Sequence, residues 1–186
     1  MLDTEIFVPA GLTSKMYDKI ETLVVSLYED LKLENSPINP FEIAKQKGYI
    51  LKPYSKIKTE LSDLLRRSGM AGTCVRTKDG YYKIFYDDSD VETRQRFTIM
   101  HEIGHIVLGH KESSAFAEKC ANYYASYSLS PTPLIGVFDC EDFIDVSTCF
   151  NISYESAIYA FNRYMKWLQM PNDLKPYEIK LKSFFE

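Results

Sequence analysis

The stretch Arg96-Phe97-Thr98-Ile99-Met100-His101-Glu102-Ile103-Gly104-His105 is the part of the sequence that decides the fold. A helix advances about 100° per residue, so residues four apart lie about 40° from each other on one face. His101 and His105 therefore share a face. Apolar residues occupy the other side of the same helix: Ile99, Met100, Ile103 and Val107. We expect one face of this helix to pack in a core and the other to carry both histidines.

The limits of this helix are predicted from the residues that flank it. Ser89 followed by Glu92 has the spacing of a capping box, in which each side chain accepts a hydrogen bond from a free backbone N–H of the first turn. Gly109 stands where a C-terminal capping glycine belongs. We expect the helix to run from Ser89 to Leu108.

His101, Glu102 and His105 form a pattern that suits a zinc ion. Two imidazoles one turn apart can point ring nitrogens at one ion, and Glu102 lies where it can reach a water molecule on that ion. The chain has 3 histidines, and two of them stand in this pattern. This favours a metal site over a solvated helix with two incidental histidines. We expect His101 and His105 to bind Zn²⁺, and Glu102 to be the catalytic base that activates the water.

A catalytic zinc ion needs a third protein ligand and one open position. One class of zinc enzymes supplies a third histidine ten positions after the first, preceded by a glycine three positions earlier, but here those positions are Lys111 and Leu108. His110 follows Gly109 and would lie about 180° from His101 in a continued helix. His110 is therefore predicted to be a helix-terminal or rim residue.

Glu118 is the predicted third ligand. It lies on the next expected helix, from Ser114 to Leu129, and small or polar residues share its face by the three-and-four spacing: Ala115, Ala121, Asn122 and Ala125. Such residues would let the two helices approach closely enough to deliver the carboxylate. Glu112 is the alternative, but it falls in the turn between the helices and has no such face.

The donor that stabilises an oxyanion is left open by the sequence. Peptide hydrolysis usually requires one. Four side chains are candidates, and spacing singles out none of them: Arg96, His110, Tyr123 and Tyr124.

The remaining elements indicate an α+β fold, mainly helical, with a small three-stranded antiparallel sheet beside the helix that carries His101 and His105. The expected helices and strands are helix 13–33, helix 41–47 ended by Gly48, strands 49–54, 70–76 and 81–86, and two helices within 139–170 joined at 151–153. We divide the chain into an N-terminal helical extension (1–36), a core (37–131), a C-terminal helical pair that packs on the core (132–170) and a tail (171–186).

Composition restricts the partners and the compartment. The net charge of -4 and the pI near 5.5 argue against a surface for nucleic acid or anionic membranes. Residues 1–15 show no signal peptide, and the uncharged run from Cys120 to Phe138 is interrupted by Asn122, Pro131 and Pro133, so no membrane span is expected. The four cysteines contain no C-x-x-C pair and are expected to be buried thiols: Cys74, Cys120, Cys140 and Cys149. We expect a cytoplasmic protein.

Two motifs resemble those of the ImmA/IrrE metallopeptidases. Residues 96–105 are similar to the active-site helix of that family, and Glu118-x-x-Ala121-Asn122-x-Tyr124-Ala125 is similar to its second motif. Residues 40–44 with Gly48 resemble its N-terminal helix and strand. The resemblance covers about residues 37–131 and extends weakly to 170. One departure is Leu129-Ser130-Pro131, where the family commonly has an apolar pair before the proline.

The resemblance implies that Glu118 is the third zinc ligand and that the protein is a peptidase of narrow specificity. It implies a protein substrate, a helix-turn-helix repressor of a mobile element or a stress regulon, which the peptidase cleaves or relieves. The bond that is cut, the activating signal and the oligomeric state are not indicated.

Two other functions compete with this one. The first is a transcription regulator with structural zinc, because residues 139–168 suggest a helix-turn-helix. The range 132–170 has a net charge of -3, from five acidic and two basic residues, which argues against phosphate contacts: Asp139, Glu141, Asp142, Asp145 and Glu155 against Arg163 and Lys166. The second is a partner-binding protein with a vestigial site, against which the intact Glu102 argues.

Overall fold

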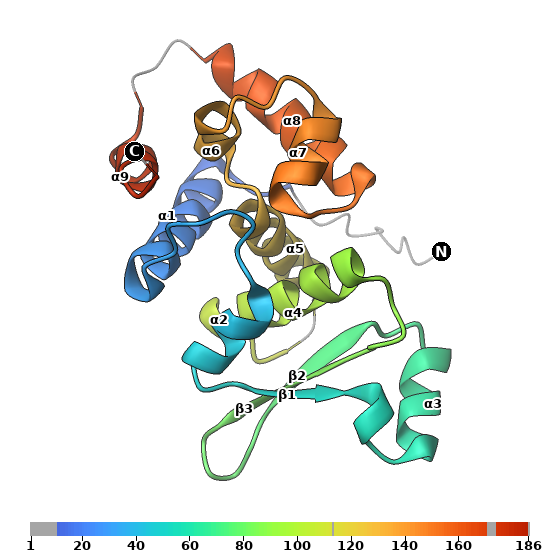
Figure 1. Ribbon diagram of the computed structural model, residues 1–186. Coiled ribbons are helices and arrows are strands. Elements are labelled where there is room, and N and C mark those ends of the chain that lie inside the picture. The colour runs from blue at the N-terminus through green and yellow to red at the C-terminus, as the bar shows by residue number, and fades with distance from the viewer. Residues whose placement is uncertain (1–10, 113, 171–173, 186) are drawn as a thin grey trace, which may run out of the picture.

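The computed structural model describes residues 11–112, 114–170 and 174–185. Figure 1 shows the sheet on one side of helix α4 and most of the other helices on the opposite side. In chain order the elements are α1 (Ser14–Leu31), α2 (Pro40–Gln46), β1 (Ile50–Pro53), the 3₁₀ helix η1 (Tyr54–Lys56), α3 (Thr59–Arg67), β2 (Gly72–Arg76), β3 (Tyr82–Tyr86), α4 (Glu92–Val107), α5 (Ala115–Leu129), α6 (Thr132–Val137), α7 (Phe143–Phe150), α8 (Tyr154–Leu168) and α9 (Pro176–Lys182).

The α+β class and the three strands are confirmed, but the prediction of an antiparallel sheet is wrong. The strand order is β1-β3-β2, with β1 parallel and β2 antiparallel to β3. Ile84 of the central strand β3 pairs with Leu51 of β1 on one side and with Cys74 of β2 on the other. The long connection from β1 to β2 contains α3, which the sequence analysis did not predict, and it carries the chain to the far edge of the sheet. A crossover of this kind permits a parallel pair that a short turn does not.

The start of α4 differs from the predicted capping box. The N-cap residue is Val91, and no side chain caps the helix. The Ser89 hydroxyl donates to the Asp87 carboxylate at 2.7 Å, and the Glu92 carboxylate accepts from the Asn151 amide at 3.0 Å. Both predicted partners are thus engaged elsewhere. The predicted end is close to the observed one, because Gly109 has φ +70° and follows the C-cap residue Leu108.

The later helices largely agree with the expected ones. Ser114 caps α5, where its hydroxyl accepts from the Ala117 N–H at 3.0 Å. The predicted pair within 139–170 is present as α7 and α8, joined at Asn151, which has φ +48°. Helix α6 was not predicted, and α9 lies in the region that the sequence left unassigned. Leu181 of α9 is fully buried, so this segment packs on the body of the protein.

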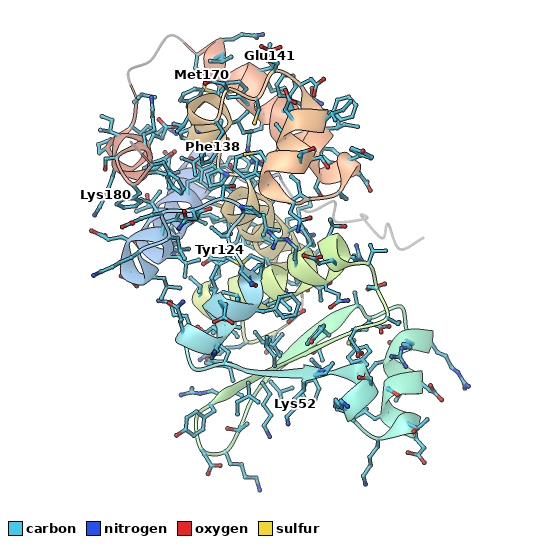
Figure 2. All side chains as sticks on the ribbon, in the orientation of Figure 1. Lys52, Tyr124, Phe138, Glu141, Met170 and Lys180 are labelled. Carbon is cyan, nitrogen blue, oxygen red and sulfur yellow. The ribbon has the colours of Figure 1, made fainter. Side chains whose placement is uncertain are left out.

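The core is centred on α1, α4 and α5. Val24, Ile99, Ile103 and Ala125 are fully buried there. Tyr124 lies in the same interior, as Figure 2 shows. Burial of this apolar surface stabilises the fold and fixes α4 along its packing face.

The helices and the cysteines bear on the predictions of no membrane span and of buried thiols. Within the described ranges, every helix is too short or too polar to cross a membrane. The four cysteines are free thiols, as predicted, but only Cys120 and Cys140 are buried; Cys74 and Cys149 are partly buried, so the prediction of burial is wrong for these two.

Candidate metal centre

Helices α4 and α5 cross closely because Gly104 stands at their contact. A methyl group at Gly104 would lie 3.0 Å from Cδ1 of Tyr124 and 3.3 Å from the Ala121 carbonyl oxygen. The sequence predicted that small residues of α5 would permit the close approach. Ala121 and Ala125 are indeed fully buried. Ala115 and Asn122 are exposed, but the Asn122 side chain still forms a hydrogen bond with His101 of α4.

The crossing brings together the three predicted metal ligands. His101 Nε2 lies 3.0 Å from His105 Nε2 and 3.3 Å from Glu118 Oε2, and His105 Nε2 lies 3.4 Å from Glu118 Oε1. Two donors that are each about 2.1 Å from a tetrahedral zinc ion stand about 3.4 Å apart. The three side chains therefore have the chemistry and the spacing of a zinc site with one open position. Their role as ligands stays a prediction. Glu112, the alternative, is exposed and stands outside this group.

Electrostatics keep the two imidazoles in the form that binds metal. Burial lowers the pKa of both His101 and His105, and the nearby Glu118 carboxylate opposes this shift. The pKa of His105 is lowered further by the charge of His101. Metal ligation requires neutral imidazole, so a lowered pKa favours binding near pH 7.

Glu102 lies next to the ligands in a buried position. Its side chain contacts β2, because Gly72 lets the strand approach: a methyl group there would lie 2.4 Å from Thr98 Cγ2 and 3.5 Å from Glu102 Cγ. Burial raises the pKa of Glu102 to about 7; the charge of Glu118 adds to this rise, and a hydrogen bond with Cys74 opposes it. A carboxyl group with this pKa can accept a proton and return it near neutral pH.

His110 contacts the site in a way that the sequence analysis missed. Its Nδ1 lies 3.0 Å from Nδ1 of His105, and the centroids of the two rings are 5.0 Å apart. The predicted position of His110, about 180° from His101, assumed that the helix continued past Gly109. The left-handed conformation of Gly109 ends the helix and turns the chain back toward His105. A glycine directly before a histidine at a helix end is the signal that predicts such a return.

Three of the four candidates for stabilising an oxyanion are engaged elsewhere or buried. Arg96 is buried, and its guanidinium donates to the carbonyl groups of Ile38, Phe150 and Asn151. Tyr124 is fully buried in the core. The Tyr123 hydroxyl donates to the Glu21 carboxylate. Their sequence proximity to the motif did not reveal which way they point.

A groove of about 1080 Å³ lies close to the metal centre but does not include it, because the three ligands and Glu102 are not among its lining residues. Phe97, one turn before His101 on α4, lines the groove. The centroid of its ring is 6.3 Å from that of the His101 ring. Asn122, one turn after Glu118 on α5, lines it too. Because these turns follow one another on the same helix faces, the groove leads away from the metal centre. Its far wall comes from α1 and α8 and from the residues just before each helix, which contribute Leu12, Tyr17, Ser153, Glu155, Ser156 and Tyr159.

Comparison with known families identifies the family of the chain. The sequence profile of Peptidase_M78, the IrrE N-terminal-like domain, matches residues 64–185. The match includes α4 and α5, begins later than the resemblance noted from the sequence and extends further, through α9. Comparison with curated proteins gives no match. Since the profile covers more than half of the chain, this protein belongs to the Peptidase_M78 family of IrrE N-terminal-like domains, a family of metallopeptidases.

Proposed function

We propose that this protein is a zinc-dependent endopeptidase, with His101, His105 and Glu118 as metal ligands and Glu102 as the catalytic base. The observation that carries the proposal is the convergence of three ligand atoms from two helices, with a buried carboxyl group beside them. A purely structural metal site has no need of that fourth group. The buried Glu102 therefore favours catalysis over a structural or vestigial site.

The residues divide the work between binding and proton transfer. When bound, zinc supplies a Lewis acid that polarises the scissile carbonyl and acidifies a water molecule. Glu102 holds the proton that is removed from the water and passes it to the leaving amine. Its burial and its pKa of about 7 suit both steps. Arg96, through its three carbonyl partners, holds α4 in place and takes no part in the chemistry.

The groove beside the ligands is the proposed path of the substrate. Its volume of about 1080 Å³ is slightly above the range for small-molecule sites, roughly 300–1,000 Å³. Aromatic side chains from three helices face it (Phe97, Tyr123 and Tyr159), with charged groups at Arg94, Lys119 and Glu155. Such a surface suits a stretch of polypeptide with alternating apolar and polar side chains.

The substrate we propose is a protein, a helix-turn-helix repressor of a mobile element or stress regulon, acted on in the cytoplasm. The support is the family membership together with the motifs at residues 96–105 and 118–125. Nucleic acid is not the proposed partner, because the segment with α7 and α8 carries an excess of acidic side chains.

A cleavage assay with defined metal content tests the proposal. Purified protein loaded with one equivalent of Zn²⁺ would be incubated with a purified helix-turn-helix repressor encoded beside its gene, and with a complex peptide library analysed by mass spectrometry. We expect discrete cleavage that stops with a chelator and with Glu102→Gln. Full zinc loading with no cleavage of either substrate would favour the alternative, a regulator or partner-binding protein with a structural or vestigial site.

A further inference from the structure

We propose that His110 is a positioning residue for the metal centre: its Nδ1 accepts a hydrogen bond from the Nδ1–H of His105 and thereby directs the Nε2 lone pair of His105 at the metal. The inference rests on the proposed metal site. The two Nδ1 atoms are 3.0 Å apart, a normal hydrogen-bond length. His110 is itself partly buried, so the contact is partly shielded from water.

The backbone at the end of α4 sets this geometry. The His110 N–H donates to the His105 carbonyl at 3.0 Å, and the Gly109 N–H donates to the Ile106 carbonyl at 3.2 Å. These two bonds, with Gly109 in the left-handed region, are those of a Schellman motif. The motif ties the residue after the glycine to the residue five positions earlier. The same turn that ends the helix therefore sets the His110 ring beside the His105 ring.

Tautomer chemistry makes this contact relevant to the metal. A neutral imidazole has one N–H and one lone pair, so a histidine that binds metal through Nε2 carries its proton on Nδ1. His105 directs Nε2 toward His101 and Glu118, which leaves its Nδ1 as the donor. His110 must then accept through Nδ1 and carry its own proton on Nε2. A partner of this kind fixes the ring orientation and the tautomer of a metal ligand.

The other histidine of the site is held differently. Nδ1 of His101 is buried and makes no direct hydrogen bond to any described residue, while the Asn122 side chain of α5 is hydrogen-bonded to the His101 ring. The Phe97 ring, whose centroid is 6.3 Å from that of His101, also packs against it. The His105 ring is held instead by the contact of its Nδ1 with His110. Loss of that bond is expected to weaken metal binding.

A matched pair of variants separates the hydrogen bond from the shape of the side chain. Asparagine can place an oxygen acceptor near the position of Nδ1, and leucine has a similar branched shape without an acceptor. We expect His110→Leu to weaken Zn²⁺ affinity about 10- to 100-fold in chelator competition, and His110→Asn to stay within about 3-fold of the wild type. Both variants keep the backbone N–H, and hence the Schellman motif, so both are expected to fold, which circular dichroism would check.

A second measurement reads the hydrogen bond without metal. Nitrogen-15 NMR of the metal-free protein should show His105 as the Nδ1–H tautomer in the wild type and in His110→Asn, and a mixture in His110→Leu. Equal loss of affinity in both variants, or no loss in either, would overturn the inference. If the wild type binds no Zn²⁺, the proposed function fails, while the tautomer measurement still decides whether His110 orients His105.

Discussion

Gly104 and Tyr124 face each other where α4 crosses α5, so closely that a single methyl group at Gly104 would stand 3.0 Å from the Tyr124 ring. This contact sets the separation of the two helices that supply the metal ligands. His101 and His105 lie on one helix and Glu118 lies on the other, and the Glu118 oxygens are 3.3 and 3.4 Å from the two histidine Nε2 atoms. The glycine inside the histidine motif thus serves the site as well as the core.

Gly104→Ala is expected to destabilise the protein and to weaken metal binding. Overpacking costs about 1–3 kcal/mol, and the higher helix propensity of alanine returns at most about 1 kcal/mol. We expect a net loss of about 1–2 kcal/mol in urea unfolding and a lower Zn²⁺ affinity. Gly11→Ala is the control, because its added methyl group meets nothing within 4 Å. Unchanged stability and affinity in Gly104→Ala would contradict this prediction and show that α4 and α5 can move apart without loss.

Glu102→Gln is expected to remove catalysis and leave the metal. General acid–base groups contribute about 10²- to 10⁴-fold to rates, so kcat should fall by that amount while Zn²⁺ affinity stays near the wild-type value. Because burial raises the pKa of Glu102 to about 7, the pocket prefers a neutral side chain, and the variant should melt no lower than the wild type. Glu118→Gln is the contrasting variant, since it should lose affinity as well as rate.

Arg96→Met is expected to destabilise the fold through carbonyl groups left without a donor. The guanidinium donates to three carbonyl oxygens at 2.9–3.2 Å in a buried setting. Hydrogen bonds to charged groups contribute about 1.5–3 kcal/mol each and are not additive, so we expect a loss of about 2–4 kcal/mol in denaturant unfolding. Normal stability combined with a large fall in kcat would instead return Arg96 to the list of catalytic groups.

The lowered pKa of Asp87 predicts that part of the folding stability is lost in acid. Burial alone would raise the pKa of Asp87, but hydrogen bonds from Arg66 and Ser89 outweigh this, and the net pKa is lowered. A carboxylate with a lowered folded-state pKa stabilises the fold above its unfolded pKa of about 3.9 and loses that contribution as the pH falls further. Asp87→Asn should therefore melt below the wild type at pH 6. The difference should narrow between pH 4 and pH 2.5; a constant difference would rule out this origin.

Tyr159→Ala tests whether the groove binds the substrate. Tyr159 lines the groove and is 66% exposed, so its loss should leave the fold intact. An aromatic contact contributes about 1 kcal/mol, and we expect KM for a cleaved peptide to rise about 5-fold with little change in kcat. Tyr154→Ala is the matched control, on the same helix and 63% exposed but outside the groove.

Helix periodicity predicted the features that local chain geometry determines, and few others. The shared face of His101 and His105 and the approximate bounds of α5 were predicted because each follows from local chain geometry. Gly104 shows the limit: its place in the motif was visible, but its contact with Tyr124 depends on how two helices cross.

Other misses have related causes. The capping box failed because Asp87 and Asn151 compete for its members. The parallel β1–β3 pair depends on a crossover with α3, a short helix whose Leu61 and Leu64 are exposed and give no clear apolar face. The Asn151 contact and the β1–β3 pair depend on residues distant in sequence, whereas Asp87 is a local competitor two residues from Ser89.

The three carbonyl partners of Arg96 have a consequence for dissecting the protein. Ile38 belongs to the segment before α2, whereas Phe150 and Asn151 belong to the end of α7. A fragment cut after Pro131 would keep one of the three acceptors and would expose a guanidinium that the whole chain keeps out of water. The helix with the histidines is thereby locked to both flanking regions, so a minimal catalytic piece should need its C-terminal helices to stay soluble and folded.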